Sequence, residues 1–386
     1  MLRKFLSILY HYILYNIFYP WLYKKYARKP INKNKIVFIE GSYPYITNSS
    51  KLLYDTLKNN PNYEIHTHFL QTGFLPRKEY LKVCINMVKD IADAKYVFIN
   101  EACIITSCFT MRKETIFTQL WHGCGAFKKF GFNLAGKLVC PDPKILQLYH
   151  KNYTHVTVSS PEVIWAYEEA MNLKKGIVQA TGCSRTDIFF DSSYKEKAYQ
   201  HLYDFFPHAK GKKVILYAPT FRETVKEAKS PTMLDISKFQ EALQDEYVLM
   251  LKYHPLCHQR PTIADNAQNF AIDCSTTMSI EDLIFVSDLC ISDYSSLIFE
   301  YSLFERPMIF FAYDLEEYSQ WYGFYYDYKN FVPGPIYSTN EEMIHYIKNI
   351  DTQFNKQQVI DFKNKFMNAC DGHSTERIIN LVFQKS

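Results

Sequence analysis

The stretch LCISDYSSLIFEYSLFERPMIFFAYD, residues 289–314, decides the fold class. It contains a short apolar run at 289–293, a helix-like segment at 294–304 and a second apolar run at 307–314. A strand, a crossing helix and a second strand are typical of a βαβ unit, in which the two strands lie parallel in one sheet. The stretch therefore predicts an α/β protein with a buried parallel sheet.

The same alternation continues on both sides of this unit. Strand-like runs precede it at 212–220 and 247–255, and a helix-like run at 279–288 begins with Ser279 as a predicted N-cap. The first half of the chain shows a similar series, with strand-like runs at 35–40, 64–70, 94–100, 116–123 and 155–160 and helix-like runs at 48–59, 77–93 and 161–171. A polar stretch at 190–212 separates the two series. We therefore expect an arm at 1–30, a first domain at 31–195 and a second domain at 196–386, with a ligand site between the domains at the carboxyl ends of the strands.

Composition and charge exclude several classes of protein. Of the 386 residues 47% are hydrophobic and 22% are charged, which excludes a disordered chain. Residues 1–39 contain eight Lys or Arg and no Asp or Glu, so the rest of the chain holds 36 basic and 40 acidic residues. An acidic body argues against a nucleic-acid partner. The ten Cys form no CxxC pair or zinc-ligand spacing, which indicates reduced cytosolic thiols and no metal centre.

The arm contains an uncharged stretch, residues 5–23, between Arg3-Lys4 and Lys24-Lys25. Three interpretations are open for it: an amphipathic helix lying on a membrane surface, a transmembrane helix, or a helix packed on protein. We favour the first, because helical spacing gathers apolar residues on one side and the flanking cations attract anionic lipid. The residues on that side are Leu6, Leu9, Ile13, Leu14, Ile17 and Trp21. We therefore expect an anionic membrane surface as a partner.

Polar residues follow several of the predicted strands and suggest an active site. His122 follows one strand of the first half, whereas Thr220, Arg222 and His254 follow strands of the second half. Asp293, Ser295 and Ser296 lie where a strand passes into a helix, and a helix start that carries hydroxyls favours a phosphate or diphosphate. Each residue also has a structural alternative: a packed histidine, a surface arginine or an aspartate N-cap. P-loop, GxGxxG and GxSxG motifs are absent from the sequence.

Six segments in fixed order carry a resemblance to a known family. They are QLWHGCGAFKKFG (119–131), TGCSRTDIFF (181–190), YAPTFRET (217–224), LKYHP (251–255), 291–318 and GFYYDYKNFVPGP (323–335). Together they resemble the CDP-glycerol glycerophosphotransferase family of teichoic-acid synthesis, and the chain length resembles its compact, primase-like members.

The resemblance implies a GT-B-like fold of two Rossmann-type domains around a central cleft. It implies transfer of glycerol phosphate from CDP-glycerol to a hydroxyl of a lipid-linked diphosphate saccharide, with release of CMP. It also implies a peripheral position at the cytoplasmic face of the bacterial cell membrane. No resident cofactor or metal is expected, and Mg²⁺ on the donor diphosphate stays an open alternative.

The resemblance also implies roles for residues at the matching positions. His122 resembles the general base that takes the proton of the acceptor hydroxyl, and His254 resembles the second essential histidine, which in its charged form would meet the donor diphosphate. Donor-binding positions are implied at Gly123, Cys124, Gly125, Arg185, Pro219, Thr220, Arg222, Lys252, Tyr253, Ser292, Asp293, Tyr294, Ser295 and Ser296.

The WHGCGAFKK segment differs from the WHGTPLKK of many family members, so the identity of the alditol and of the acceptor is open. A CDP-ribitol transferase of the same family, a GT-B glycosyltransferase that uses a nucleotide sugar, and a catalytically silent membrane scaffold remain alternatives.

Overall fold

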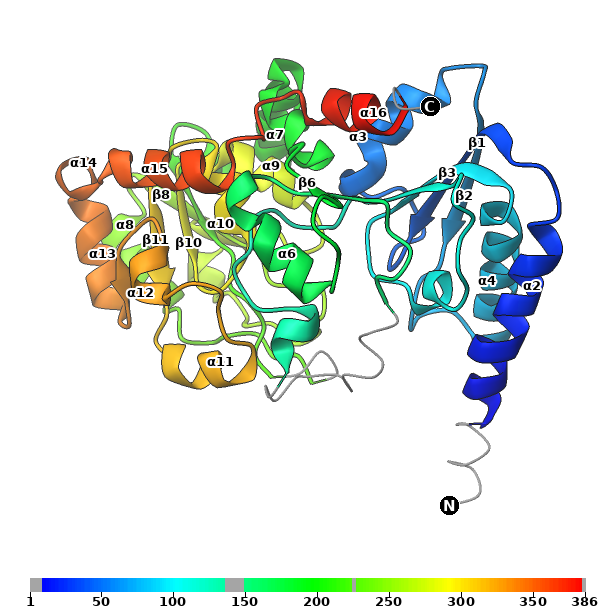
Figure 1. Cartoon of the computed structure of the whole chain (residues 1–386). Coiled ribbons are helices and arrows are strands. Elements are labelled where there is room, and N and C mark those ends of the chain that lie inside the picture. The colour runs from blue at the N-terminus through cyan, green and yellow to red at the C-terminus, as the bar shows by residue number, and fades with distance from the viewer. Residues whose placement is uncertain (1–8, 136–148, 224–226, 384–386) are drawn as a thin grey trace.

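The computed structural model describes residues 9–135, 149–223 and 227–383. It contains two six-stranded sheets whose strand pairs are all parallel, and the two halves of the chain lie side by side (Figure 1). The predicted α/β class with two parallel sheets is therefore confirmed.

The first sheet has the order β2-β1-β3-β4-β5-β6. Its strands are β1 (Asn32–Glu40), β2 (Glu64–Phe69), β3 (Ala94–Ile99), β4 (Ile116–Gln119), β5 (His155–Thr157) and β6 (Val178–Gln179). Residues 36–39 of β1 are completely or almost completely buried, as their unbroken apolar run predicted. The sequence pattern missed β6, because two residues give no periodic signal.

The second sheet has the order β12-β11-β10-β7-β8-β9. Its strands are β7 (Lys213–Tyr217), β8 (Tyr247–Leu251), β9 (Ala271–Asp273), β10 (Leu289–Ser292), β11 (Met308–Phe311) and β12 (Ile336–Tyr337). The βαβ stretch from which the fold class was predicted forms β10, α10 and β11. The short strands β9 and β12 extend the sheet at its two edges.

Helices cover the sheets and connect their strands. They are α2 (Tyr19–Tyr26), α3 (Asn48–Lys58), α4 (Arg77–Ile91), α6 (Ile164–Ala170), α7 (Ser192–Phe205), α8 (Ile236–Leu243), α9 (Ile280–Val286), α10 (Leu297–Ser302), α11 (Leu315–Trp321), α12 (Tyr328–Phe331), α13 (Asn340–Lys348), α14 (Ile350–Gln353), α15 (Lys356–Phe366) and α16 (Ser374–Phe383). The predicted N-cap of α9 is confirmed, because the Ser279 hydroxyl accepts the backbone N–H of Asp282.

The last helix does not stay with the second half of the chain. Helix α16 lies beside α3 at the first sheet (Figure 1), where Ile378 and Val382 are buried in one cluster with Ile36. The ring of Phe383 lies 4.3 Å from that of Tyr96 on β3. The predicted second domain, 196–386, therefore ends in a segment that completes the core of the first sheet. The proposed boundary at 195/196 stays a prediction.

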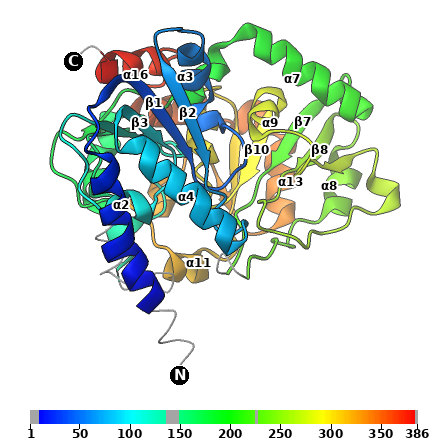
Figure 2. The ribbon, with the colours of Figure 1, turned by 90° about the vertical axis from the view of Figure 1, so that its right-hand side faces the viewer.

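The N-terminal helix has two apolar sides. It covers residues 9–26, with a π-helical stretch at Leu14–Phe18, and it runs along α4 (Figure 2). Tyr19, Leu22 and Tyr23 are buried on this side, so helix packing on the protein itself accounts for part of the pattern. The other side leaves Leu9, Ile13, Ile17 and Trp21 exposed. Leu14 is partly buried rather than exposed, and Leu6 lies outside the described residues. In the described ranges we find no helix with the length and apolarity that a bilayer crossing requires.

Candidate active site

Each sheet contains a point at which its strand order reverses. In the first sheet this point lies between β1 and β3, and in the second between β7 and β10. Ligands of open parallel sheets bind at the carboxyl ends of strands beside such a point. Asn100 follows β3, and Asp293 follows β10. The predicted site residues are concentrated at these two positions.

His122 lies at the reversal point of the first sheet. Its Nδ1 is 3.3 Å from the carbonyl oxygen of Asn100. A carbonyl oxygen only accepts hydrogen bonds, so Nδ1 carries the proton and Nε2 of the neutral ring keeps its lone pair. Trp121 holds the ring from one side, with the two ring centroids 4.5 Å apart. Trp121 has a φ of 59°, a left-handed conformation that is strained for a bulky residue and that turns the chain sharply before His122.

The surroundings of His122 suit a base. Although the side chain is exposed, the dense protein around it disfavours the charged form and lowers its pKa, while the carboxylate of Glu101 acts in the opposite direction. Glu101 is itself held by the hydroxyl of Ser42, at 2.7 Å. His122 is therefore neutral and able to accept a proton at neutral pH.

The segment after His122 reaches across to the second half of the chain. A Cβ on Gly123 would lie 3.5 Å from the hydroxyl of Ser296, and one on Gly125 would fall within 2.2 Å of the Phe299 ring. Gly125 also has a φ of 66°, so glycine is required there for two reasons. The backbone N–H of Lys129 donates to Gly323, 3.0 Å away. The glycines thus let this segment lie directly against the start of α10.

Lys128 is a site residue to which the sequence analysis gave no role. Its Nζ donates to the hydroxyl of Tyr318 at 3.3 Å and lies over the rings of Tyr318 and Tyr322. Burial lowers the pKa of Lys128 to about 8, although Asp293 opposes the shift. Lys128 belongs to the WHGCGAFKK segment, and this membership was the only sign in the sequence that it could be a site residue. A lysine in a polar run looks like a surface cation until the path of the segment is known.

His254 follows β8, and its position agrees with the predicted site at the strand ends. Its Nδ1 accepts the backbone N–H of Leu256 at 3.2 Å, so Nε2 carries the proton of the neutral ring. Burial, together with the charge of Lys128, lowers the pKa of His254 to about 4. The surrounding protein and a neighbouring cation thus disfavour a second positive charge here, and the expectation that His254 meets phosphate in its charged form stays a prediction. In its neutral form the ring offers one N–H donor.

Arg222 is occupied by protein partners. Its Nη2 donates to Asp314 at 3.0 Å, and its Nη1 donates to Asp293 at 2.8 Å. The guanidinium also lies over the ring of Tyr294, 5.1 Å from the centroid. Asp293 in turn accepts both the N–H and the hydroxyl of Thr220, each at 2.8 Å. In this structure Arg222, Asp293 and Thr220 therefore shape the loops at the reversal point instead of offering free donors.

Arg185 connects the two halves. Its Nη1 donates to the carbonyl oxygen of His122 at 2.6 Å, and its Nη2 donates to Glu281 of the second half at 3.0 Å. This places Arg185 behind the predicted base, as a group that fixes its position.

The other residues predicted to bind the donor fall into two groups, those that are buried or bonded to protein and those that are partly exposed. The ammonium of Lys252 donates to three carbonyl oxygens, those of residues 274, 275 and 278, and the hydroxyl of Ser292 donates to Ala218. The side chains of Cys124, Pro219, Tyr253 and Tyr294 are buried. Ser295 and Ser296 are partly exposed and keep hydroxyl groups at the start of α10. The side chains available to a ligand are thus those of His122, Lys128, His254, Ser295 and Ser296.

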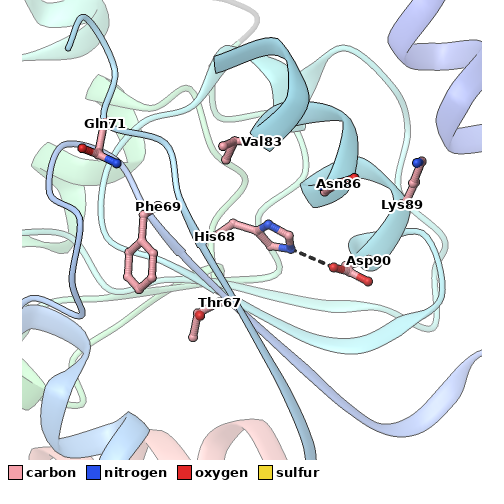
Figure 3. A pocket seen from close by; sticks show the side chains of 8 residues that line it. All are labelled: Thr67, His68, Phe69, Gln71, Val83, Asn86, Lys89 and Asp90. Carbon is pink, nitrogen blue, oxygen red and sulfur yellow. Dashed lines mark hydrogen bonds and ion pairs between the residues drawn. The ribbon is translucent and has the colours of Figure 1, made fainter. Parts of the chain in front are cut away.

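Two surface hollows differ in their relation to this site. One, of about 510 Å³, lies between β2 and α4 (Figure 3), and its His68 is paired with Asp90 at 2.9 Å. It contains none of the predicted residues. The other, of about 350 Å³, is bordered by Arg222, Tyr318 and Tyr322, of which the two tyrosines contact Lys128. The second hollow therefore adjoins the candidate site.

Comparisons with known proteins agree with the motifs. The family model described as CDP-Glycerol:Poly(glycerophosphate) glycerophosphotransferase matches residues 21–384. The chain is 36% identical over 384 residues to the teichoic acid poly(ribitol-phosphate) polymerase of Bacillus spizizenii, a match that covers 99% of this chain and 60% of the polymerase. It is 32% identical over 362 residues to the teichoic acid ribitol-phosphate primase of the same organism, which covers 92% of each chain.

The fold is also similar to a solved structure. The wall teichoic acid polymerase TagF superposes with a TM-score of 0.78 at 23% identity, over 100% of this chain and 97% of the other. At this identity the likeness concerns the fold, and it supports the GT-B-like arrangement of two parallel-sheet domains.

Proposed function

We propose that this chain, which belongs to the CDP-glycerol:poly(glycerophosphate) glycerophosphotransferase family, transfers an alditol phosphate from a CDP-alditol to a hydroxyl of a lipid-linked saccharide acceptor and releases CMP. Family membership makes it an enzyme of teichoic acid synthesis, and the donor and the acceptor are the proposed part. One observation carries the proposal. Nδ1 of His122 faces a carbonyl oxygen, whereas Nδ1 of His254 faces a backbone N–H. We infer from this that the two neutral rings are opposite tautomers, so that Nε2 of His122 presents a lone pair and Nε2 of His254 presents an N–H.

The base acts first in the proposed reaction. Nε2 of His122 takes the proton of the acceptor hydroxyl while the hydroxyl oxygen attacks the β-phosphorus of the donor. The bond from that phosphorus to the bridging oxygen breaks, and CMP leaves with the electron pair. The Asn100 carbonyl stabilises the imidazolium that forms, because it accepts the Nδ1–H throughout the step.

Other side chains meet the charge of the donor. Lys128 supplies a cation, His254 an N–H, and Ser295 and Ser296 hydroxyl groups, all directed at phosphoryl oxygens in a site where much of the water is displaced. The helix α10 spans only Leu297–Ser302, so we assign the positive charge to these side chains rather than to the helix. No resident metal or cofactor enters the proposal, and Mg²⁺ carried in on the diphosphate is a condition to vary in the assay.

CDP-ribitol is the donor we favour. Both curated relatives described above are named for ribitol phosphate, whereas from the sequence alone we expected CDP-glycerol. CDP-glycerol remains the second candidate, because the description of the matching family names glycerophosphate.

A donor screen tests the proposal. The purified chain is incubated with CDP-ribitol, CDP-glycerol or UDP-sugars and a lipid-diphosphate disaccharide, and the released nucleotide and the product masses are measured. CMP release with one alditol phosphate added supports the transfer, and the preferred donor separates the two candidates. Nucleotide-sugar turnover would identify a glycosyltransferase instead. Wild-type rates of CMP release in both His122→Ala and His254→Ala would exclude the mechanism. The matched control is His345→Ala on the exposed side of α13, which should release CMP at the wild-type rate.

We also propose that the N-terminal helix binds an anionic membrane surface at the cytoplasmic face of the cell membrane. Its exposed stripe of Leu9, Ile13, Ile17 and Trp21 ends beside the exposed cations Lys24 and Lys25. The Lys25 ammonium lies over the Trp21 ring, 5.3 Å from the centroid. An apolar stripe next to cations fits a lipid interface, where Trp enters the headgroup level and Lys meets the anionic headgroups.

A further inference from the structure

Three cysteines that are far apart in the sequence meet in the interior. Cys124 lies in the segment after His122, Cys183 lies just before the short helix Ser184–Phe190, and Cys370 lies between α15 and α16. Their Sγ atoms all lie within 4.8 Å of one another. The three residues are only 3%, 4% and 3% exposed. In the described ranges this is the one group of three or more ligand-type side chains arranged closely enough to hold a metal ion.

The spacing of the thiols suits a single ion. Zn²⁺ binds thiolate sulfur at about 2.3 Å in tetrahedral geometry, which places two sulfurs on the same ion about 3.8 Å apart. Closing the group from at most 4.8 Å to this spacing requires movements of less than about 1 Å per atom pair, within the reach of small rotations of the side chains.

A buried carboxylate lies in the surroundings of the thiols without belonging to the group of three. Glu300 on α10 is 4% exposed, and its buried Oε2 has no hydrogen-bond partner. A buried carboxylate oxygen without a partner is costly, and a cation bound nearby would lower that cost.

A fixed positive charge lies near the group. The guanidinium of Arg185 is 3.6 Å from the carboxylate of Glu300, and it also interacts electrostatically with Cys124 and Cys183. Metal ligands must be deprotonated, and a nearby cation favours the thiolate form.

We propose that the thiolates of Cys124, Cys183 and Cys370 bind one Zn²⁺ ion. The three thiols release their protons to solvent as the three bonds to the ion form, and nothing is oxidised or reduced. Three thiolates supply three of the four ligands of a tetrahedral ion, and the fourth position is left to water. Because the three thiols are buried, we assign the ion a structural rather than a catalytic role.

The ion would join three parts of the chain. Cys124 belongs to the segment that carries His122 and Lys128, Cys183 precedes Arg185, and Cys370 precedes the helix that returns to the first sheet. A zinc ion here would fix the predicted base relative to the C-terminal segment without touching a substrate. This inference is independent of the identity of the donor.

Metal titration tests the site in the whole chain. Protein stripped of metal under reducing conditions is titrated with Co²⁺, whose bonds to thiolate sulfur give a charge-transfer absorption, and Zn²⁺ is then added to displace it. We expect one ion per chain and a rise in Tm with added Zn²⁺. Cys124→Ser, Cys183→Ser and Cys370→Ser should each weaken binding by at least about tenfold. The control Cys84→Ser removes a thiol that is equally buried in α4 and should bind as wild type does.

Three results would overturn the proposal. The first is a wild-type chain that shows no thiolate absorption with Co²⁺ and takes up no Zn²⁺, a result that needs no variant to fold. The second is equal affinity in Cys84→Ser and in the three cluster variants. The third is a disulfide between two of the three cysteines, found by mass spectrometry in protein isolated under reducing conditions.

Discussion

The Nδ1 of His122 lies 3.3 Å from the carbonyl oxygen of Asn100, so a residue at the end of β3 sets the protonation of the predicted base. The backbone at the reversal point of the first sheet thus orients the imidazole ring that is proposed to act as base. The carboxylate of Glu101 also acts on His122 and raises its pKa, against the larger effect of burial.

The pH dependence of the reaction should report His122. Its pKa is lowered, so we expect the acid limb of kcat/KM to lie below pH 6.5, the ordinary value for histidine. In Glu101→Gln the limb should move to still lower pH, because the carboxylate stabilises the imidazolium. The matched control is Glu114→Gln, an exposed carboxylate of the same half that does not affect the pKa of His122. A limb that moves upward in Glu101→Gln would contradict the assignment.

Replacing the base itself should affect transfer more than binding. His122→Ala is expected to lower the rate of transfer by about 10²–10⁴, because the acceptor hydroxyl loses its proton acceptor. The dissociation constant of the CDP-alditol, measured by calorimetry, should change little. A variant that keeps more than a tenth of wild-type turnover would show that another group acts as base.

Lys128 should set the alkaline limb of the same profile. Its pKa is about 8, so the cation is present below that pH and is lost above it, and kcat/KM should fall as the pH rises through about 8. Lys128→Arg keeps the charge at high pH and should remove this limb, whereas Lys128→Met should weaken donor binding at all pH values. An unchanged limb in Lys128→Arg would assign it to another residue.

Arg222 should matter for stability. Arg222→Ala removes the cation that is paired with both Asp293 and Asp314 and should lower the free energy of unfolding by about 3 kcal/mol, measured by urea denaturation. Arg260→Ala is the control, since Arg260 is paired with Asp273 at 3.4 Å, where both side chains are more exposed. That variant should lose less than about 1 kcal/mol. Equal stability of the wild type and Arg222→Ala would contradict this structural role and would favour direct binding of the donor by Arg222.

Two glycine variants separate backbone strain from close packing. Gly176→Ala, with a φ of 89° and open space around its Cβ position, should cost about 1–2 kcal/mol of stability. Gly125→Ala carries similar strain and also collides with Phe299, so it should cost about 1–3 kcal/mol more. Equal losses in thermal or urea unfolding would mean that the segment at 123–129 moves away from α10 without penalty.

Membrane binding should depend on the exposed stripe of the first helix. A double variant with Ile17→Ser and Trp21→Ser should bind anionic vesicles less tightly, because both side chains are exposed and apolar. Phe74→Ser, at another exposed apolar side chain, is the control. High salt should weaken binding only in part, since it screens the cations and not the apolar contact. Unchanged cosedimentation of the double variant with vesicles would contradict this surface.

The sequence predicted the strands of the interior well and the partners of charged residues poorly. β7, β8 and β10 are runs of mostly apolar residues, and such runs are stable only in the protein interior. Their sequence pattern was therefore sufficient to predict buried strands. The partner of Arg222, however, stands 92 residues away at Asp314, and no local pattern encodes such a pair. Arg222 therefore looked like a free phosphate ligand. The low pKa of His254 could not be predicted for the same reason, because Lys128 approaches it only through the fold.

The position of α16 affects how the protein is made. Ile36 and Phe38 of β1 are completely buried, and Ile378 and Val382 of α16 belong to the same cluster. During synthesis β1 and α3 leave the ribosome long before α16, so the part of this face that α16 covers stays exposed to solvent until nearly all of the second half has been translated. The core of the first half is therefore completed late. Its final folding step is coupled to the emergence of residues 374–383.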